Sequence, residues 1–131
     1  GEQQGVDLVI NNRIEMRMAP TTIDSSGIKK AEVSGWIRLL DGRDPDTLSL
    51  VLFADAFPPP IFSYVGRVGW VPTIEFTAHI RRRPAPGWIQ GKFWTEDLND
   101  GRMIETGLLW DSTGALVAQS RQLAMFLPLD A

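Results

Sequence analysis

A short apolar helix in the middle of the chain is the feature that most limits the possible folds. We predict that it starts with Asp44 as the N-cap and Pro45 as the first helical residue. Residues 48–56 are almost all apolar, and Asp55 is their one charge. We therefore expect the helix to be covered on most of its sides. Three consecutive prolines at residues 58–60 remove backbone donors and end it.

Alternating apolar and polar residues on both sides of this helix predict β-strands. The expected strands are residues 14–18, 31–40, 73–82, 88–95, 102–110 and 116–126. Hairpin turns are expected at residues 99–101 and 111–114, where Asn, Asp and Gly are concentrated. One sheet curled around one helix would bury all these faces.

This order predicts an α+β domain with a hotdog fold, in which an antiparallel sheet wraps around one central apolar helix. A small lipocalin-like or jelly-roll barrel is the competing architecture, and the apolar helix in mid-chain argues against both. With 131 residues, the chain is predicted to form a single domain over residues 1–131. Residues 1–7 are polar and begin with glycine, so we expect them to be disordered or an added extension, and the chain to be a fragment.

Composition excludes several classes of function. The chain has no cysteine and one histidine, His79, so thiolate and multi-histidine metal sites are excluded, and no cofactor is expected. A formal charge of −3 without a continuous basic face disfavours nucleic acid as a partner. No apolar run approaches the roughly 20 residues that cross a bilayer, so no membrane partner is expected and a cytoplasmic location is favoured.

Three residues are candidates for chemistry, each with an ordinary structural alternative. Asp55 lies one turn before the end of an apolar helix, where a desolvated carboxylate could act as a general base or simply cap the following loop. Gln122 alternates with small residues on the last strand, which leaves room for a ligand, although a solvent-facing amide is equally ordinary. Thr73 opens its strand after a proline and could be no more than a β-branched strand residue.

Strict alternation creates a conflict at Thr73. Ile74, Phe76 and Ile80 are expected to face the helix, so Thr73 would point away from the core unless pairing is irregular near the strand end. His79 falls in the same polar set and is interpreted as a residue of the outer strand face. The arginines at residues 81–83 are interpreted as a solvated turn that could also contact a phosphate.

Four segments together resemble successive motifs of the TesB-like acyl-CoA thioesterases. They are ADAFPP at residues 54–59, PTIEFTAHIR at residues 72–81, GLLWD at residues 107–111 and AQSRQLA at residues 118–124. The resemblance runs from Ile14 to Phe126 and is to the C-terminal hotdog of these double-hotdog enzymes. It implies that the aspartate, threonine and glutamine that hold and activate water in the family fall on Asp55, Thr73 and Gln122.

The implied activity is hydrolysis of acyl-CoA to free fatty acid and CoA, with Asp55 as general base. A non-catalytic acyl-binding or assembly module is the alternative, and a dehydratase that uses His79 is a third. Because the N-terminal hotdog is absent, we expect a homodimer or pairing with a second hotdog domain. The aromatic segment at residues 88–95, or a neighbouring strand, is the expected pairing edge.

Overall fold

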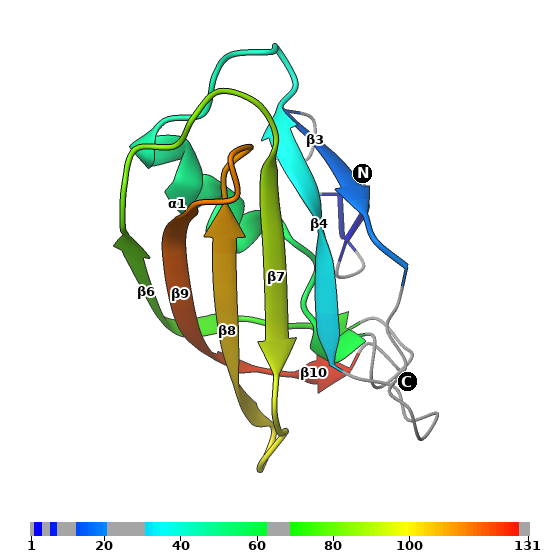
Figure 1. Cartoon of the computed structure of the whole chain (residues 1–131). Helices are drawn as coiled ribbons and strands as arrows, with labels where there is room; N and C mark the ends of the chain where they lie inside the picture. The colour runs from blue at the N-terminus through cyan, green and yellow to red at the C-terminus, as the bar shows by residue number, and fades with distance from the viewer. Residues whose placement is uncertain (1, 4–5, 8–12, 21–30, 63–68, 129–131) are drawn as a thin grey trace.

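The computed structural model of the chain describes residues 2–3, 6–7, 13–20, 31–62 and 69–128 (Figure 1). One helix, α1 (Thr47–Ala56), packs against a sheet of six strands. The strands of this sheet are β3 (Ile14–Met18), β4 (Glu32–Leu39), β6 (Thr73–Ile80), β7 (Ile89–Thr95), β8 (Arg102–Trp110) and β9 (Leu116–Met125). Two further ladders join β1 (Glu2–Gln3) to β2 (Val6–Asp7) and β5 (Gly69–Trp70) to β10 (Leu127–Pro128). No helix in the described part of the chain is long and apolar enough to cross a membrane.

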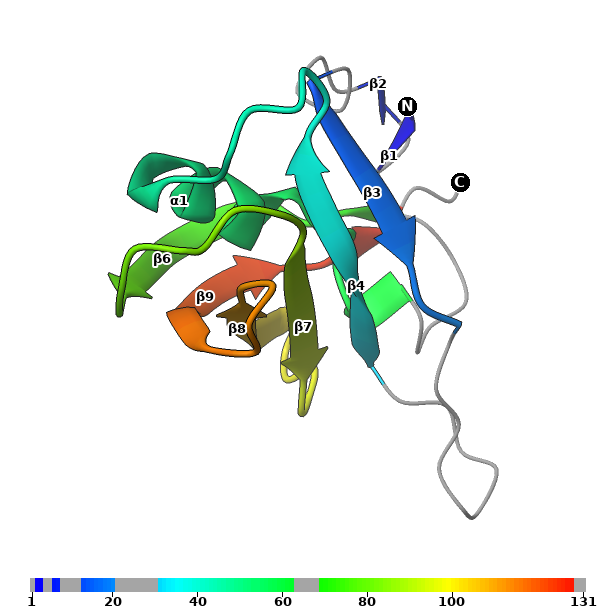
Figure 2. The same ribbon diagram turned by 45° about the horizontal axis from the view of Figure 1, so that its top comes forward.

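The sheet is antiparallel throughout and has the strand order β3-β4-β7-β8-β9-β6. Figure 2 shows it curving around α1, which packs over β6, β8 and β9. The hairpin between β7 and β8 turns at Asp100 and Gly101, which both have positive φ, as two-residue hairpins with a right-handed strand twist require. The α+β arrangement and the two hairpins predicted from the sequence are thus confirmed, with strand bounds within a few residues of those expected.

The expectation that the aromatic strand at residues 88–95 is a pairing edge is wrong. β7 lies between β4 and β8 and is hydrogen-bonded to both. The free edges of the described sheet are β3 and β6. In β6 only Phe76 and Ala78 are even half-buried. The apolar residues of β7 have another use, since Ile89 and Phe93 are fully buried in the core.

The predicted start of the helix is also wrong. Asp46, not Asp44, is the N-cap, and its carboxylate accepts a hydrogen bond of 2.8 Å from the Ser49 backbone. The Ser49 hydroxyl in turn accepts a bond from the Asp46 backbone N–H at 2.6 Å, which completes a capping box. Phe57 ends the helix in an extended conformation, as the following proline favours.

The helix is less enclosed than its composition suggested. Leu50, Phe53, Ala54 and Ala56 are buried against the sheet, whereas the side chain of Leu48 is 79% exposed and that of Val51 is 42% exposed. These two lie on the same outer stripe as Asp55, which is also exposed. The prediction that the helix is covered on most sides is therefore wrong for this chain by itself. Its apolar composition leaves a bare stripe.

Two glycines let the end of the helix approach the sheet closely. A Cβ on Gly91 would lie 2.7 Å from the ring of Phe57, and a Cβ on Gly107 would lie 2.4 Å from the ring of Phe93. The two phenylalanine rings pack on each other with centroids 4.8 Å apart. This contact fixes the last turn of α1, and with it Asp55, above the strands that carry the rest of the site.

Candidate functional site

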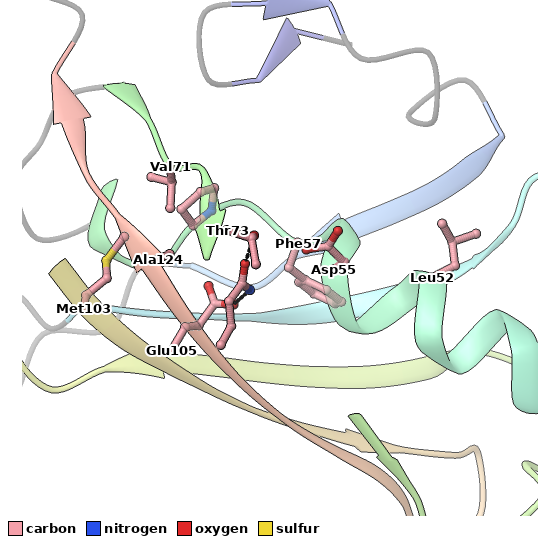
Figure 3. Close-up of a pocket in the computed structure, with 10 residues that line it drawn as sticks. Leu52, Asp55, Phe57, Val71, Thr73, Met103, Glu105 and Ala124 are labelled. Atoms are coloured by element: carbon pink, nitrogen blue, oxygen red, sulfur yellow. Dashed lines mark hydrogen bonds between the residues drawn. The ribbon is translucent and has the colours of Figure 1, made fainter. Parts of the chain in front are cut away.

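The end of α1 and the inner face of β6, β8 and β9 enclose a cavity of about 190 Å³ (Figure 3). Its polar lining comes from Asp55 of the helix, Thr73 of β6, Glu105 of β8 and Gln122 of β9. Its apolar lining consists of Leu52, Phe57, Pro59, Val71, Met103 and Ala124. The structure thus brings together the three residues that the sequence nominated, and it adds a fourth, Glu105. A polar cavity of this size has room for water.

A chain of side-chain hydrogen bonds crosses three strands in the cavity. The Thr73 hydroxyl donates to the side-chain carbonyl of Gln122. The Gln122 amide nitrogen donates to the carboxyl oxygen Oε2 of Glu105 at 2.8 Å (Figure 3). Gln122 is 7% exposed, and its amide has a partner on each side. Such satisfied buried polar groups hold a fixed geometry.

A β-bulge explains why Thr73 faces this cavity. The pairing of β6 with β9 shifts register between Thr73 and Glu75, so that Thr73 pairs with Ala124 and Phe76 pairs with Gln122. Residues that pair directly across two strands project from the same face, and Ala124 and Gln122 both line the cavity. The expectation that Ile74 faces the helix is wrong. Ile74 is the extra, unpaired residue of the bulge, and it is 52% exposed.

Asp55 enters the cavity from the last turn of α1. It remains in contact with solvent at the rim, yet the surrounding protein removes part of its hydration, and this desolvation raises the pKa of its carboxyl group. A higher pKa makes an ionised carboxylate a stronger base toward water. Asp55 makes no hydrogen bond to Thr73 or Gln122, so its oxygens remain available to the cavity.

Glu105 is the residue that our sequence analysis missed. Desolvation, followed by repulsion from the Asp55 carboxylate, raises its pKa to about 8, against an opposing hydrogen bond from Gln122. The sequence did contain a signal, because Met103, Glu105, Gly107 and Leu109 share one face of a predicted strand. A single carboxyl among apolar and small residues on a core-facing strand departs from the usual pattern and marks a candidate site.

The other polar residues considered from the sequence lie outside the cavity. His79 is exposed on β6 and pairs with Gln119, on the face of the sheet opposite to Gln122. The arginines at residues 81–83 are exposed, and Arg81 donates to Gln119 at 2.8 Å. Among the described residues no group of three His, Cys, Asp or Glu side chains could hold a metal ion.

Solved structures with the same architecture define the class to which this fold and site belong. A protein of Alicyclobacillus acidocaldarius described as having a hot dog fold superposes with a TM-score of 0.78 over 88% of this chain and 46% of its own, at 20% identity. A candidate thioesterase II from Thermobifida fusca is 34% identical, with a TM-score of 0.73 over 87% of this chain and 46% of its own. The TesB protein of Mycobacterium avium subsp. paratuberculosis is 25% identical, with a TM-score of 0.73 over 92% and 50% of the two chains. The chain is therefore a hotdog domain of the thioesterase type.

The family can be stated more narrowly. The sequence profile of the acyl-CoA thioesterase C-terminal domain matches residues 2–126, and the chain belongs to that family. An uncharacterized protein of Mycobacterium tuberculosis H37Rv is 37% identical over 84 residues, which cover 64% of this chain and 28% of that protein. The chain spans about half the length of each of the three solved structures named above. The predicted resemblance to the TesB-like C-terminal hotdog is confirmed.

Proposed function

We propose that this domain supplies the hydrolytic site of an acyl-CoA thioesterase that releases a free fatty acid and CoA. The observation that carries the proposal is the meeting of Asp55, Thr73 and Gln122, from three separate elements, in one cavity of a domain in this family. The proposal places the enzyme in the cytoplasm and requires no metal or redox cofactor.

The chemistry follows from the donors and acceptors at hand. The Thr73 hydroxyl donates a hydrogen bond to the Gln122 carbonyl. The lone pairs of the Thr73 oxygen therefore remain free to accept a hydrogen bond from a water molecule. Asp55 takes the other proton of that water while the water oxygen forms a bond to the thioester carbonyl carbon. The tetrahedral intermediate then collapses, the carbon–sulfur bond breaks, and the CoA thiolate leaves with a proton from the Asp55 carboxylic acid or from solvent.

The hydrogen bonds of Gln122 to Thr73 and Glu105 also fix the direction of the second hydrogen on its amide nitrogen. One hydrogen is committed to Glu105, and the amide has two. The remaining N–H can stabilise negative charge on the thioester oxygen as the intermediate forms. Leu52, Val71 and Met103 provide apolar lining suited to the methylene groups next to that carbonyl.

A partner is part of the proposal. Thr73 of the site lies on the exposed edge β6, and Asp55 lies on the same helix as the bare stripe of Leu48 and Val51. The Thermobifida and Mycobacterium avium structures are about twice the length of this chain. We expect a second hotdog domain, or a second copy of this chain, to cover this edge and this stripe. The same surfaces support the alternative of a non-catalytic acyl-binding or assembly module. No observation favours a dehydratase that uses His79.

Thiol release from acyl-CoA substrates of several chain lengths separates these functions. In the full-length protein, Asp55→Asn should lower kcat by roughly 10²- to 10⁴-fold, the range expected when a general base is lost. Asp97→Asn, at an exposed carboxylate that does not line the cavity, should retain the wild-type rate. Equal rates for wild type and Asp55→Asn would remove Asp55 from the mechanism, and inactivity of the wild type on every chain length would favour the non-catalytic module.

A further inference from the structure

The cavity contains a carboxyl group that the hydrolysis described above does not use. Glu105 lies directly across from Gln122 in the β8–β9 pairing and is bonded to its amide nitrogen. It is held where ionisation is unfavourable, next to a second carboxylate. A carboxyl group in such a place costs free energy that a glutamine or an apolar side chain would avoid. Its position against Gln122 therefore calls for an explanation.

Gln122 on its own could adopt either of two orientations. A half-turn of the side-chain amide exchanges its carbonyl oxygen and its NH₂ group, and the two occupy nearly the same volume. The Thr73 hydroxyl does not decide between them, because a hydroxyl can donate to the carbonyl or accept from the NH₂ group. An ionised carboxylate does decide, because it can only accept, and above its pKa of about 8 Glu105 holds the NH₂ group on its own side. Below that pKa the Glu105 carboxylic acid has an O–H donor of its own and sets the orientation less strictly.

This choice matters for the proton on Thr73. With the NH₂ group toward Glu105, the carbonyl of Gln122 faces Thr73 and accepts its proton. The Thr73 oxygen then presents lone pairs to the cavity. In the opposite orientation the NH₂ group would donate to Thr73, whose own proton would point elsewhere and could compete with water for Asp55. The two orientations give different sites from the same residues.

We propose that Glu105 is a positioning residue of the hydrolytic site, which acts through Gln122 by fixing the orientation of its side-chain amide and thereby the direction of the Thr73 proton. The inference rests on the proposed function. It adds a role for a fourth residue, on a fourth element, that makes no contact with the reacting atoms.

The test compares Glu105→Gln with wild type in the full-length protein. This variant keeps the size of the side chain and removes its ionisable group, so above pH about 8 it is expected to fold at least as stably as the wild type. Because the amide introduced by this substitution carries both a donor and an acceptor, either orientation of Gln122 becomes possible. At about pH 9, where Glu105 of the wild type is ionised, we expect kcat to fall about tenfold in Glu105→Gln, as when one hydrogen bond to a charged group is lost, with KM within about twofold. Glu105→Asp keeps the acceptor-only group and should recover part of the rate.

A spectroscopic measurement tests the orientation without relying on activity. The side-chain amide protons of Gln122, identified by their absence in a Gln122→Leu variant, should shift as Glu105 titrates in the wild type and should not shift in Glu105→Gln. Glu75→Gln is the matched control, because Glu75 is exposed on the outer face of β6, and it should change neither the amide signals nor kcat.

The outcomes distinguish this inference from the function on which it rests. An active wild type whose kcat and Gln122 signals are unchanged in Glu105→Gln would overturn the role of Glu105 and leave the hydrolase intact. A change of the amide signals without a fall in kcat would show that the orientation does not matter for hydrolysis and would also overturn it. Inactivity of the wild type on all acyl-CoA substrates would overturn the proposed function and this inference with it.

Discussion

Thr73 and Phe76 project from the same face of β6 although three positions separate them along the strand. The register shift between Thr73 and Glu75 adds one residue to the strand without adding a pair. Phe76 consequently packs against the core beneath α1, while Thr73 reaches Gln122. The bulge thus determines whether the threonine is a site residue or a surface residue.

Two threonines of β6 test which residues of this strand face the site. Thr73→Ala removes the hydroxyl that orients water, so we expect kcat/KM to fall at least about tenfold. Thr77 is exposed on the opposite face, and Thr77→Ala should leave acyl-CoA hydrolysis unchanged. Steady-state thiol release measures both. Equal losses in the two variants would mean that β6 alternates regularly and that the bulge is absent.

The capping box predicts which aspartate starts the helix. Asp46→Ala removes the acceptor for the Ser49 backbone N–H, and we expect the melting temperature to fall by a few degrees. Asp44→Ala, two residues earlier at an exposed position, should leave it unchanged. Thermal unfolding followed by circular dichroism decides between them. A larger effect at Asp44 would restore the start predicted from the sequence.

The raised pKa of Glu105 predicts a pH-dependent stability. Folding raises the pKa from an ordinary 4.5 to about 8, so the folded protein holds a proton that the unfolded chain releases within this window. The free energy of unfolding should therefore fall as pH rises from about 4.5 to about 8, by at most about 1.4 kcal/mol per pH unit. The raised pKa of Asp55 acts in the same direction.

Urea unfolding across this pH window, in wild type and in Glu105→Gln, isolates the contribution of Glu105. The charged or polar groups beside it in the cavity are Asp55 of α1, Thr73 of β6 and Gln122 of β9. Glu105→Gln should show the shallower decline of the two proteins. Parallel curves would mean that Glu105 titrates normally in the folded state.

A buried hydroxyl offers a test of packing. Thr95 is buried, and its Oγ1 has no hydrogen-bond partner among the described residues. Thr95→Val keeps the shape and removes the unsatisfied group, so we expect stability to be unchanged or about 1 kcal/mol greater. The hydroxyl of Thr113 instead donates to Asp111 at 2.6 Å, and Thr113→Val should cost about 1 kcal/mol. Urea unfolding compares them, and a destabilised Thr95→Val would reveal a partner for that hydroxyl.

The exposed strand β6 predicts association. By light scattering at micromolar concentration, we expect this chain to have a mass above the 14.6 kDa of a monomer. Ile74→Lys places a charge on β6 and should favour the monomer, whereas Met18→Lys on β3, the other free edge, should not. A monomer at all concentrations would contradict self-association and leave pairing with a different hotdog domain.

The sequence predicted the fold well because each strand carries its own alternation and the prolines after Phe57 mark the end of the helix. What it could not predict depended on contacts across the sheet. The bulge at Ile74 is defined by the partner strand β9, and the central place of β7 is defined by both of its neighbours. Asp55, Thr73 and Gln122 were nominated mainly by a family resemblance, and their catalytic roles stay predictions. Glu105 had a local signal that was overlooked.

The length of the helix determines where Asp55 lies. Its start is fixed by the Asp46 cap and its end by the prolines after Phe57, so the number of residues between them determines the direction of Asp55. One inserted residue would turn that carboxylate by about 100° around the helix axis and move it about 1.5 Å along it. Substitutions among the exposed positions of this segment can therefore accumulate, while insertions and deletions cannot. In related chains of variable length, the spacing from cap to prolines should stay constant wherever the aspartate is used.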